Sequence, residues 1–195
     1  QFVLGLAVLL AALWGIFTLI AKHQSFVESY YQVQSDKLTS NVRVVQLSDL
    51  HLHEFGDHNA DLIERITALK PDIIAITGDM NDKLVDDYSV VTDLCTELVK
   101  IAPVYYVPGN HEWPKIVFHN SPIGTDLEAI GVHFLADETE TLEVNGNTIA
   151  IGGVAEAPAS YERYASAYFE SFEQLDAFKL LLVHYPEYFL EDGFF

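Results

Sequence analysis

Four short apolar runs, each followed at once by polar side chains, constrain the fold of this chain more than any other feature. Each run has the length and the β-branched or aromatic content of a buried strand. The runs are residues 42–47, 72–77, 104–107 and 180–183, and they lead into Asp49 and His51, Asp79, Asn110 and His111, and His184, in that order. The chain therefore places acids, an amide and imidazoles where four predicted strands end.

The segments between these runs have the apolar spacing of helices. Predicted helices cover residues 57–70, 86–101, 124–131 and 161–172. The first would be capped by Asp57 or Asn59. Residues 141–154 predict a hairpin, because Asn145-Gly146 separates two β-rich runs. This alternation is typical of an α/β sandwich, with parallel pairing early in the chain and antiparallel pairing late.

The carboxyl ends of strands meet at one edge of an open α/β sheet, where such proteins bind their ligands. Taken singly, each polar residue has a structural explanation. Asp49 could be a cap and Asp79 a turn residue. Asn110 could be the left-handed residue of a turn, and His184 a hydrogen-bonded core histidine. Four such positions, in step with four strands, favour a shared site instead.

Carboxylate, amide and imidazole ligands together suit a pair of Mn, Fe or Zn ions. Asp49 and His51, two residues apart, can turn toward one ion, and the two oxygens of Asp79 can bridge two ions. Asn110 offers a neutral oxygen and His184 an imidazole nitrogen. Two ions about 3.5–4 Å apart can polarise a phosphoryl oxygen and activate water. The pattern therefore predicts a two-metal site for phosphate chemistry.

His111 follows Asn110 directly and need not be a ligand. A histidine beside a metal pair can protonate a leaving oxygen or stabilise charge on phosphoryl oxygens. Glu112 or another acid would orient its ring. Trp113 and Pro114 are expected to shape the loop that carries His111.

The charge balance restricts the partners. The chain has 29 acidic residues against 10 Lys plus Arg, a net charge of −19. Such a chain does not hold polyanions by electrostatics alone, so nucleic acid is disfavoured as a partner. A small-molecule or lipid phosphate ester would need cations from another source, and metal ions would supply them. Cys95 is the only cysteine, which excludes an intrachain disulfide framework and a thiolate zinc site.

Residues 2–21 form a run of 20 residues without a charge. As a helix the run would rise about 30 Å, which matches the hydrocarbon core of a bilayer. It is longer than the apolar region of a cleaved signal peptide, about 7–15 residues, so an uncleaved anchor is favoured. We expect a transmembrane anchor over residues 1–22, a juxtamembrane linker over 23–41 and a folded domain over 42–195. Lys22 alone does not decide which side of the membrane carries the domain.

The ordered series D-L-H at 49–51, G-D at 78–79, G-N-H-E at 109–112 and a late His184 resembles the calcineurin-like metallophosphoesterase superfamily. The match runs from about residue 42 to His184. With the N-terminal apolar run, the chain is most similar to the membrane-associated bacterial branch. That branch includes phosphodiesterase-type proteins and enzymes that hydrolyse the pyrophosphate of UDP-diacylglucosamine.

The resemblance implies a four-layer α/β/β/α sandwich and a two-metal site. It implies one ion held by Asp49, His51 and Asp79, and a second held by Asp79, Asn110 and His184. His111 would be the catalytic histidine. The family pattern also ends in a G-H-x-H element that adds a histidine to each metal, and no G-H-x-H occurs in this sequence. We therefore expect a fragment of a longer chain, which by itself binds metal weakly and is poorly active.

Together these features predict a membrane-anchored, metal-dependent phosphoesterase on a bacterial cell membrane. Its substrate would be a phosphomonoester, a phosphodiester or a lipid-linked pyrophosphate. The alternative is a catalytically impaired module that keeps the scaffold and serves in binding or regulation at the membrane.

Overall fold

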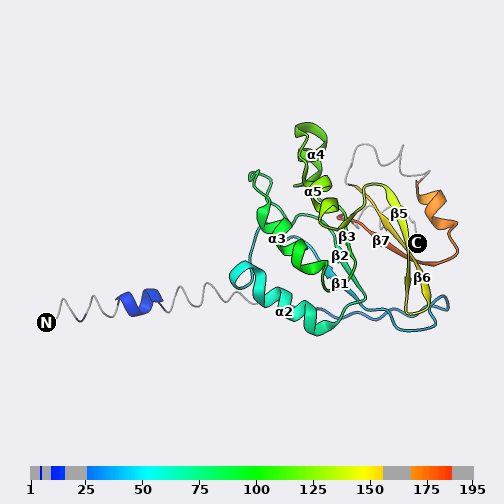
Figure 1. The fold of residues 1–195 in the computed structure, drawn as a ribbon, viewed down its shortest axis with the longest axis horizontal. Coiled ribbons are helices and arrows are strands. Elements are labelled where there is room, and N and C mark those ends of the chain that lie inside the picture. Colours follow the sequence, from blue (N-terminus) through cyan, green and yellow to red (C-terminus); the bar gives the residue numbers. More distant parts are fainter. Residues whose placement is uncertain (1–4, 6–9, 16–25, 156–167, 186–195) are drawn as a thin grey trace.

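Two sheets and the helices around them make up the described part of the chain, which in this computed structural model is residue 5 and residues 10–15, 26–155 and 168–185 (Figure 1). The first sheet is parallel and contains, in order, β1 (Val44–Leu47), β2 (Ile73–Ile76), β3 (Val104–Tyr106) and β4 (His133–Phe134). The second contains, in order, β5 (Glu138–Val144), β6 (Asn147–Gly153) and β7 (Phe178–Leu182). The helices are η1 (Asp57–Asn59, a 3₁₀ turn), α2 (Ala60–Leu69), α3 (Ser89–Leu98), α4 (Trp113–His119) and α5 (Ile123–Ala129).

Alternate side chains of the central strand β2 face opposite layers, because successive residues of a strand point to opposite faces. Ile74 packs in one core with Leu94 of α3. Its neighbour Ile73 packs in a second core with Ile151 of β6. All four residues of β2 are buried, as expected for a strand covered on both faces. The parallel sheet therefore lies between helices on one side and the second sheet on the other (Figure 1).

A short helical segment, residues 168–173, covers the outer face of the second sheet. Its Phe172 packs with Ala150 of β6 and with Ala177. Helices, parallel sheet, second sheet and helical segment thus follow one another in the predicted order of layers. The prediction of an α/β fold with a parallel sheet is confirmed.

The predicted pairing is only partly correct in the second sheet. The hairpin at Asn145-Gly146 is confirmed, with β5 and β6 antiparallel. Strand β7, however, pairs with β6 in parallel, so the expectation of antiparallel pairing late in the chain is wrong there. The connection between Gly153 and Phe178 is long enough to cross over the sheet, and a crossover is what parallel neighbours require.

Two local predictions concern the helix starts. Trp113 and Pro114 bound the loop that carries His111 by beginning helix α4: the Trp113 N–H donates to the Gly109 carbonyl at 2.9 Å, and Pro114 lies in the first turn, where a backbone N–H has no intrahelical partner. Asn59 occupies the N-cap position of α2, one of the two positions predicted, but its side chain makes no capping hydrogen bond. Its Oδ1 accepts a hydrogen bond from the Phe55 N–H at 3.1 Å, outside the helix.

The predicted membrane span at residues 2–21 lies mostly outside the described residues. Among the residues that are described, no helix is long and apolar enough to cross a bilayer. Residues 10–15 are helical, and Leu10, Leu13 and Trp14 are exposed. The transmembrane anchor stays a prediction.

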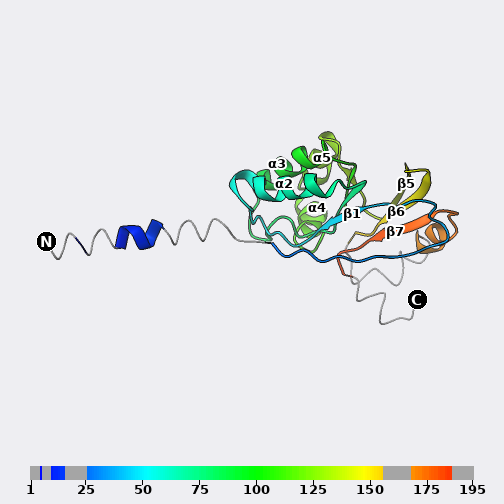
Figure 2. The same ribbon diagram turned by 90° about the horizontal axis from the view of Figure 1, so that it is seen from below.

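Residues 26–42, here called the strap, form the described part of the predicted juxtamembrane linker. The strap runs along the domain from the side of α2 to the second sheet (blue in Figure 2). Leu38 and Val42 pack against the core between the two sheets. The segment before β1 is therefore packed on the domain, and the exact domain boundary stays a prediction.

Candidate metal centre

The loops that follow β1 and β2 lie side by side and continue the parallel pairing of those strands. The Asp49 N–H donates to the Gly78 carbonyl at 3.0 Å, and the His51 N–H donates to the Asp79 carbonyl at 3.0 Å. The backbone thus brings Asp49 and His51 to Asp79, although the two loops are far apart in the sequence.

Two glycines allow the loops after β2 and β3 to touch. Gly78 has a φ of +86°, and a Cβ there would lie 2.4 Å from the Gly109 nitrogen. A Cβ on Gly109 would lie 2.3 Å from the Asp79 carboxylate. Both distances are far below van der Waals contact, so neither position accepts a larger side chain without moving the loops. The glycines of the G-D and G-N-H-E motifs therefore bring Asp79 against the loop that carries Asn110 and His111.

Several predicted ligands have left-handed backbone, which is uncommon for residues other than glycine. The φ angles of Asp49, His51 and Asp79 are 57°, 46° and 53°. Such conformations persist where the surrounding structure determines them, and they are concentrated at functional sites. Here the hydrogen bonds between the loops hold these residues in place.

The Asp79 carboxylate is the centre of the cluster. It is buried, and its Oδ1 accepts a hydrogen bond from the His111 N–H at 2.9 Å. Its Oδ2 lies 3.5 Å from His184 Nε2, 3.8 Å from His111 Nε2 and 3.9 Å from His51 Nε2. The first separation is at the upper limit of a hydrogen bond, and the other two are longer than one. They are close to the distance between two ligand atoms that bind the same ion, each at about 2.0–2.2 Å from it.

The charge of Asp79 is favoured despite its environment. Burial alone would raise the pKa of this carboxyl, but the hydrogen bonds from His184 and from the His111 backbone lower it below its ordinary value. Asp79 is therefore an anion at neutral pH, which is the state that binds a cation.

The His184 ring is oriented for cation binding. Its Nδ1 lies 2.8 Å from the Thr77 carbonyl, to which it donates, and this leaves Nε2 directed at Asn110 Oδ1, 3.0 Å away. Two acceptor atoms at this distance need a proton or a metal ion between them or beside them. In the absence of a metal, the hydrogen bond to Asp79 raises the pKa of His184 to about 9, so the ring carries that proton. A backbone carbonyl that fixes the tautomer is the usual outer partner of a metal-binding histidine.

Two groups of donors are close enough to hold ions. Asp49, Asp79 and His184 offer ligand atoms that all lie within 4.8 Å of one another, and so do His51, Asp82 and His111. The residues therefore fit a site for divalent metal with the mixed oxygen and nitrogen ligands expected of Mn, Fe or Zn.

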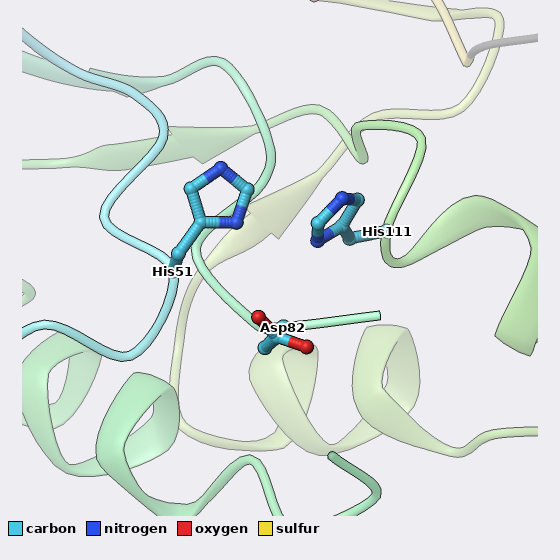
Figure 3. A group of neighbouring side chains, drawn as sticks. All are labelled: His51, Asp82 and His111. Atoms are coloured by element: carbon cyan, nitrogen blue, oxygen red, sulfur yellow. The ribbon is translucent and has the colours of Figure 1, made fainter. Parts of the chain in front are cut away.

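Figure 3 shows the second group, in which His51 and His111 face each other above Asp82. The two imidazole rings are 4.6 Å apart, centroid to centroid. Sequence reasoning missed Asp82, although it comes three residues after Asp79 and belongs to the same loop. That spacing was the available signal, but no strand ends at Asp82, so the strand-end pattern did not select it.

The ring of His111 is not oriented by Glu112, which corrects the prediction. His111 Nδ1 accepts a hydrogen bond from the Lys83 N–H at 3.0 Å. The proton of the neutral ring therefore lies on Nε2, the nitrogen that faces Asp79.

Glu112 instead holds the ligand loops together. It is fully buried, and its carboxylate accepts hydrogen bonds from the N–H groups of Asp79, Asn81 and Gly109 at 2.9, 2.8 and 3.0 Å. The Tyr106 hydroxyl donates a fourth at 3.1 Å. Burial, followed by the charge of Glu112, raises the pKa of Tyr106 well above its ordinary value, so the hydroxyl remains a donor. One buried anion thus fastens the loop of Asp79 to the loop of Asn110 and His111.

The structure brings all six predicted site residues into one cluster: Asp49, His51, Asp79, Asn110, His111 and His184. The cluster also contains Asp82, which was not predicted. Glu112 accepts hydrogen bonds from the backbone of the ligand loops and does not orient the His111 ring. The assignment of individual residues to a first or a second ion stays a prediction.

Residues 42–188 match the calcineurin-like phosphoesterase family, and the chain belongs to this family. It is 32% identical over 119 residues to the "Putative metallophosphoesterase F40B5.2" of Caenorhabditis elegans. The aligned residues make up 59% of this chain and 24% of the relative. The chain thus spans about a quarter of that relative's length.

Two solved structures have a similar fold at low sequence identity. The phosphopantetheinyl hydrolase PptH of Mycobacterium tuberculosis aligns with a TM-score of 0.51 at 17% identity, over 76% of this chain and 70% of its own. The protein TT1561 of Thermus thermophilus aligns with a TM-score of 0.52 at 16% identity, over 72% of this chain and 67% of its own. At these identities the likeness concerns the fold alone.

Proposed function

We propose that this protein hydrolyses a phosphate ester at a centre that holds two divalent metal ions, with His111 as the catalytic histidine that stabilises the charge on the leaving or phosphoryl oxygen. The observation that carries the proposal is the buried Asp79 carboxylate, whose Oδ2 has three imidazole Nε2 atoms at 3.5–3.9 Å. A buried carboxylate surrounded by imidazole nitrogens is a candidate cation site, and membership of the phosphoesterase family indicates what the cations serve.

Divalent ions at this centre would supply Lewis acidity toward a phosphoryl oxygen and lower the pKa of water. Asp49, His51, Asp79, Asn110 and His184 would hold them, and Mn, Fe and Zn are the candidates. Because the ligands are anionic or neutral, the ions also provide the positive charge that a phosphate ester needs in a protein of net charge −19. The same charge argues against nucleic acid as the substrate.

His111 has the geometry of a hydrogen-bond donor. The Lys83 N–H occupies Nδ1, so the proton of the ring is on Nε2, on the side of the metal ligands. A leaving or phosphoryl oxygen bound there would accept a hydrogen bond from that N–H, which stabilises its developing negative charge. Asp82 lies with His51 and His111 in the second group of donors that are close enough to hold an ion.

The substrate class we propose is a phosphomonoester, a phosphodiester or a lipid-linked pyrophosphate, reached from a membrane. The 20-residue uncharged run at residues 2–21 supports a single-pass anchor, and a bacterial cell membrane is the proposed location. The side of the membrane is left open.

The test is hydrolysis of a generic aryl phosphodiester by the purified protein after reconstitution with Mn, Fe or Zn. We expect His111→Ala to keep its metal content and to lose about 10²–10³-fold in rate, the usual effect of removing one hydrogen-bond donor to a developing oxyanion. His119→Ala, at an exposed position of α4, is the matched control and should behave as the wild type.

Two outcomes would contradict the proposal. If His111→Ala empties the site, His111 is a ligand and the division of roles is wrong. If the protein binds two ions but hydrolyses neither phosphomonoesters, phosphodiesters nor lipid pyrophosphates, the centre serves in binding or regulation.

A further inference from the structure

Exposed apolar side chains are concentrated before β1. Of the twelve large hydrophobic residues that are exposed in the described part of the chain, seven lie at positions 10–33. Three of these belong to the predicted membrane span. The other four, here called the exposed strip, are Val27 (91% exposed), Tyr30 (72%), Tyr31 (90%) and Val33 (74%). Single exposed apolar residues need no explanation, but four within seven residues mark a contact surface.

The first end of the strap is fastened to the domain beside the exposed strip. The Phe26 ring packs edge-on against Phe55, with centroids 5.3 Å apart. The Arg65 guanidinium of α2 binds both oxygens of Glu28, at 2.5 and 2.7 Å, and donates to the Tyr30 hydroxyl at 2.9 Å. The exposed strip therefore has a defined orientation relative to α2.

The second end of the strap is fastened near the β5–β6 hairpin. Lys37 forms an ion pair with Asp176 at 2.8 Å. The Thr39 N–H donates to Asn147 Oδ1 at 2.7 Å, and the Ser40 hydroxyl donates to the Asn145 carbonyl at 2.6 Å. Both ends of the strap are thus attached to the domain, and Tyr31 and Val33 lie between the two attachments.

The exposed strip is electrically neutral in a strongly acidic protein. Between Val27 and Gln34 the only charged residue is Glu28, and Arg65 neutralises it. The strip thus lacks the net negative charge that an anionic bilayer surface would repel. Tyrosine is also among the side chains that favour the boundary between headgroups and acyl chains.

We propose that the exposed strip rests in the interfacial layer of the membrane and holds the domain against the bilayer in one orientation. This inference rests on the membrane anchor of the proposed function. Val27 follows Lys22, the end of the uncharged run, by only five residues. At no more than about 3.5 Å per residue, it must lie within about 17 Å of the end of the anchor.

The contact would bring the metal centre close to the membrane. Phe55, against which the strap packs, is four residues beyond His51, and the His53 ring also packs against it at 4.7 Å. Phe26, which directly precedes the strip, therefore packs on the loop that carries the predicted ligand His51. A membrane-bound phosphate ester would be presented to this side of the protein.

The test uses the full chain in zwitterionic vesicles, with an environment-sensitive fluorophore on single introduced cysteines. Cys95 is fully buried, so labelling is selective for the introduced residue. The strip variants are Val27→Cys, Tyr31→Cys and Val33→Cys. Phe118→Cys, at an exposed apolar position of α4 that is 75% exposed, is the matched control, and Leu13→Cys reports the anchor itself.

We expect lipids with a nitroxide near the headgroup to quench the strip labels several-fold more than the Phe118 label, and lipids with a deep nitroxide to quench the Leu13 label.

If the Leu13 label is quenched and the strip labels are not, the strip proposal is wrong while the anchor stands. If the Leu13 label is not quenched, the predicted membrane anchor, on which the strip proposal rests, is wrong. Strip labels that are shielded from water but not quenched by lipid would indicate a protein partner. Equal quenching at Phe118 would place a different face on the membrane. Either result overturns the proposal.

Discussion

The two halves of the metal centre differ in burial. The half at the ends of β2 and β7 is closed, since the side chains of Asp79 and His184 are 5% and 6% exposed. The half at the end of β1 is open, since those of Asp49 and His51 are 56% and 38% exposed. Buried donors already have fixed partners before an ion binds, whereas exposed donors must give up water and rotational freedom. We expect the closed half to determine whether the protein binds metal at all. We expect the open half to determine how tightly a second ion binds.

The largest effect should come from Asp79, the buried carboxylate of the closed half, whose Oδ2 also faces His51 of the open half. Asp79→Asn keeps the shape of the side chain but removes the negative charge that faces three imidazoles, so we expect the protein to lose both ions. Elemental analysis after gel filtration measures this. Asp86→Asn, at an exposed position of the loop before α3, is the control and should retain metal. Full metal content in Asp79→Asn would show that the closed half does not carry the centre.

Glu112→Gln should have the next largest effect, because it removes the anion that accepts three backbone N–H groups. A hydrogen bond to a charged group contributes about 1.5–3 kcal/mol, so we expect a loss of about 2–4 kcal/mol in the free energy of unfolding. Chemical denaturation measures it, with Glu97→Gln on the exposed side of α3 as the control. Metal affinity should fall as well, since the loops of Asp79 and Asn110 are no longer fastened to each other. Unchanged stability would mean that the glutamine amide serves equally well.

Asp49→Asn tests the open half by itself. We expect the substitution to lower the affinity for one ion and to leave the affinity for the other unchanged. Calorimetric titration with Mn should then show one tight site where the wild type shows two. Asp57→Asn, an exposed acid further along the same loop, is the control. Loss of both ions would mean that the two halves are not separable.

The pH dependence of metal binding should report the closed half, with the smallest effect. His184 has a pKa raised to about 9 by its hydrogen bond to Asp79, and an ion can bind only to the neutral ring. Below that pH, binding must release the proton, so the apparent affinity should rise about tenfold per pH unit and level off above pH 9. Titration in buffers of different ionisation enthalpy measures the released proton. An affinity that does not change with pH would exclude His184 as a ligand.

Much of the fold was predictable because its elements carry local signals. The runs around Ile74 and Tyr105 have the composition of buried strands, and the apolar spacing from Leu62 to Leu69 is helical. Pairing in the second sheet was not predictable in the same way. The direction of β7 depends on where the preceding connection crosses the sheet, and the residues of β7 do not encode that path.

The members of the candidate site could be identified from the order of residues along the chain. Acids and imidazoles placed directly after β1, β2 and β3 must meet at the edge of one sheet, because parallel neighbours end on the same side. His184 follows β7 of the second sheet, so the expectation that all four strand ends belong to one sheet was wrong, and the packing of the two sheets brings this residue to the site. The contacts that each polar residue makes there are determined only in the folded molecule. Glu112 follows His111 in the chain yet faces the loop of Asp79, and Asp82 follows no strand yet lies beside two histidines. Sequence order specifies which strand end a residue follows, whereas the direction of its side chain depends on the packing of loops that are distant in the chain.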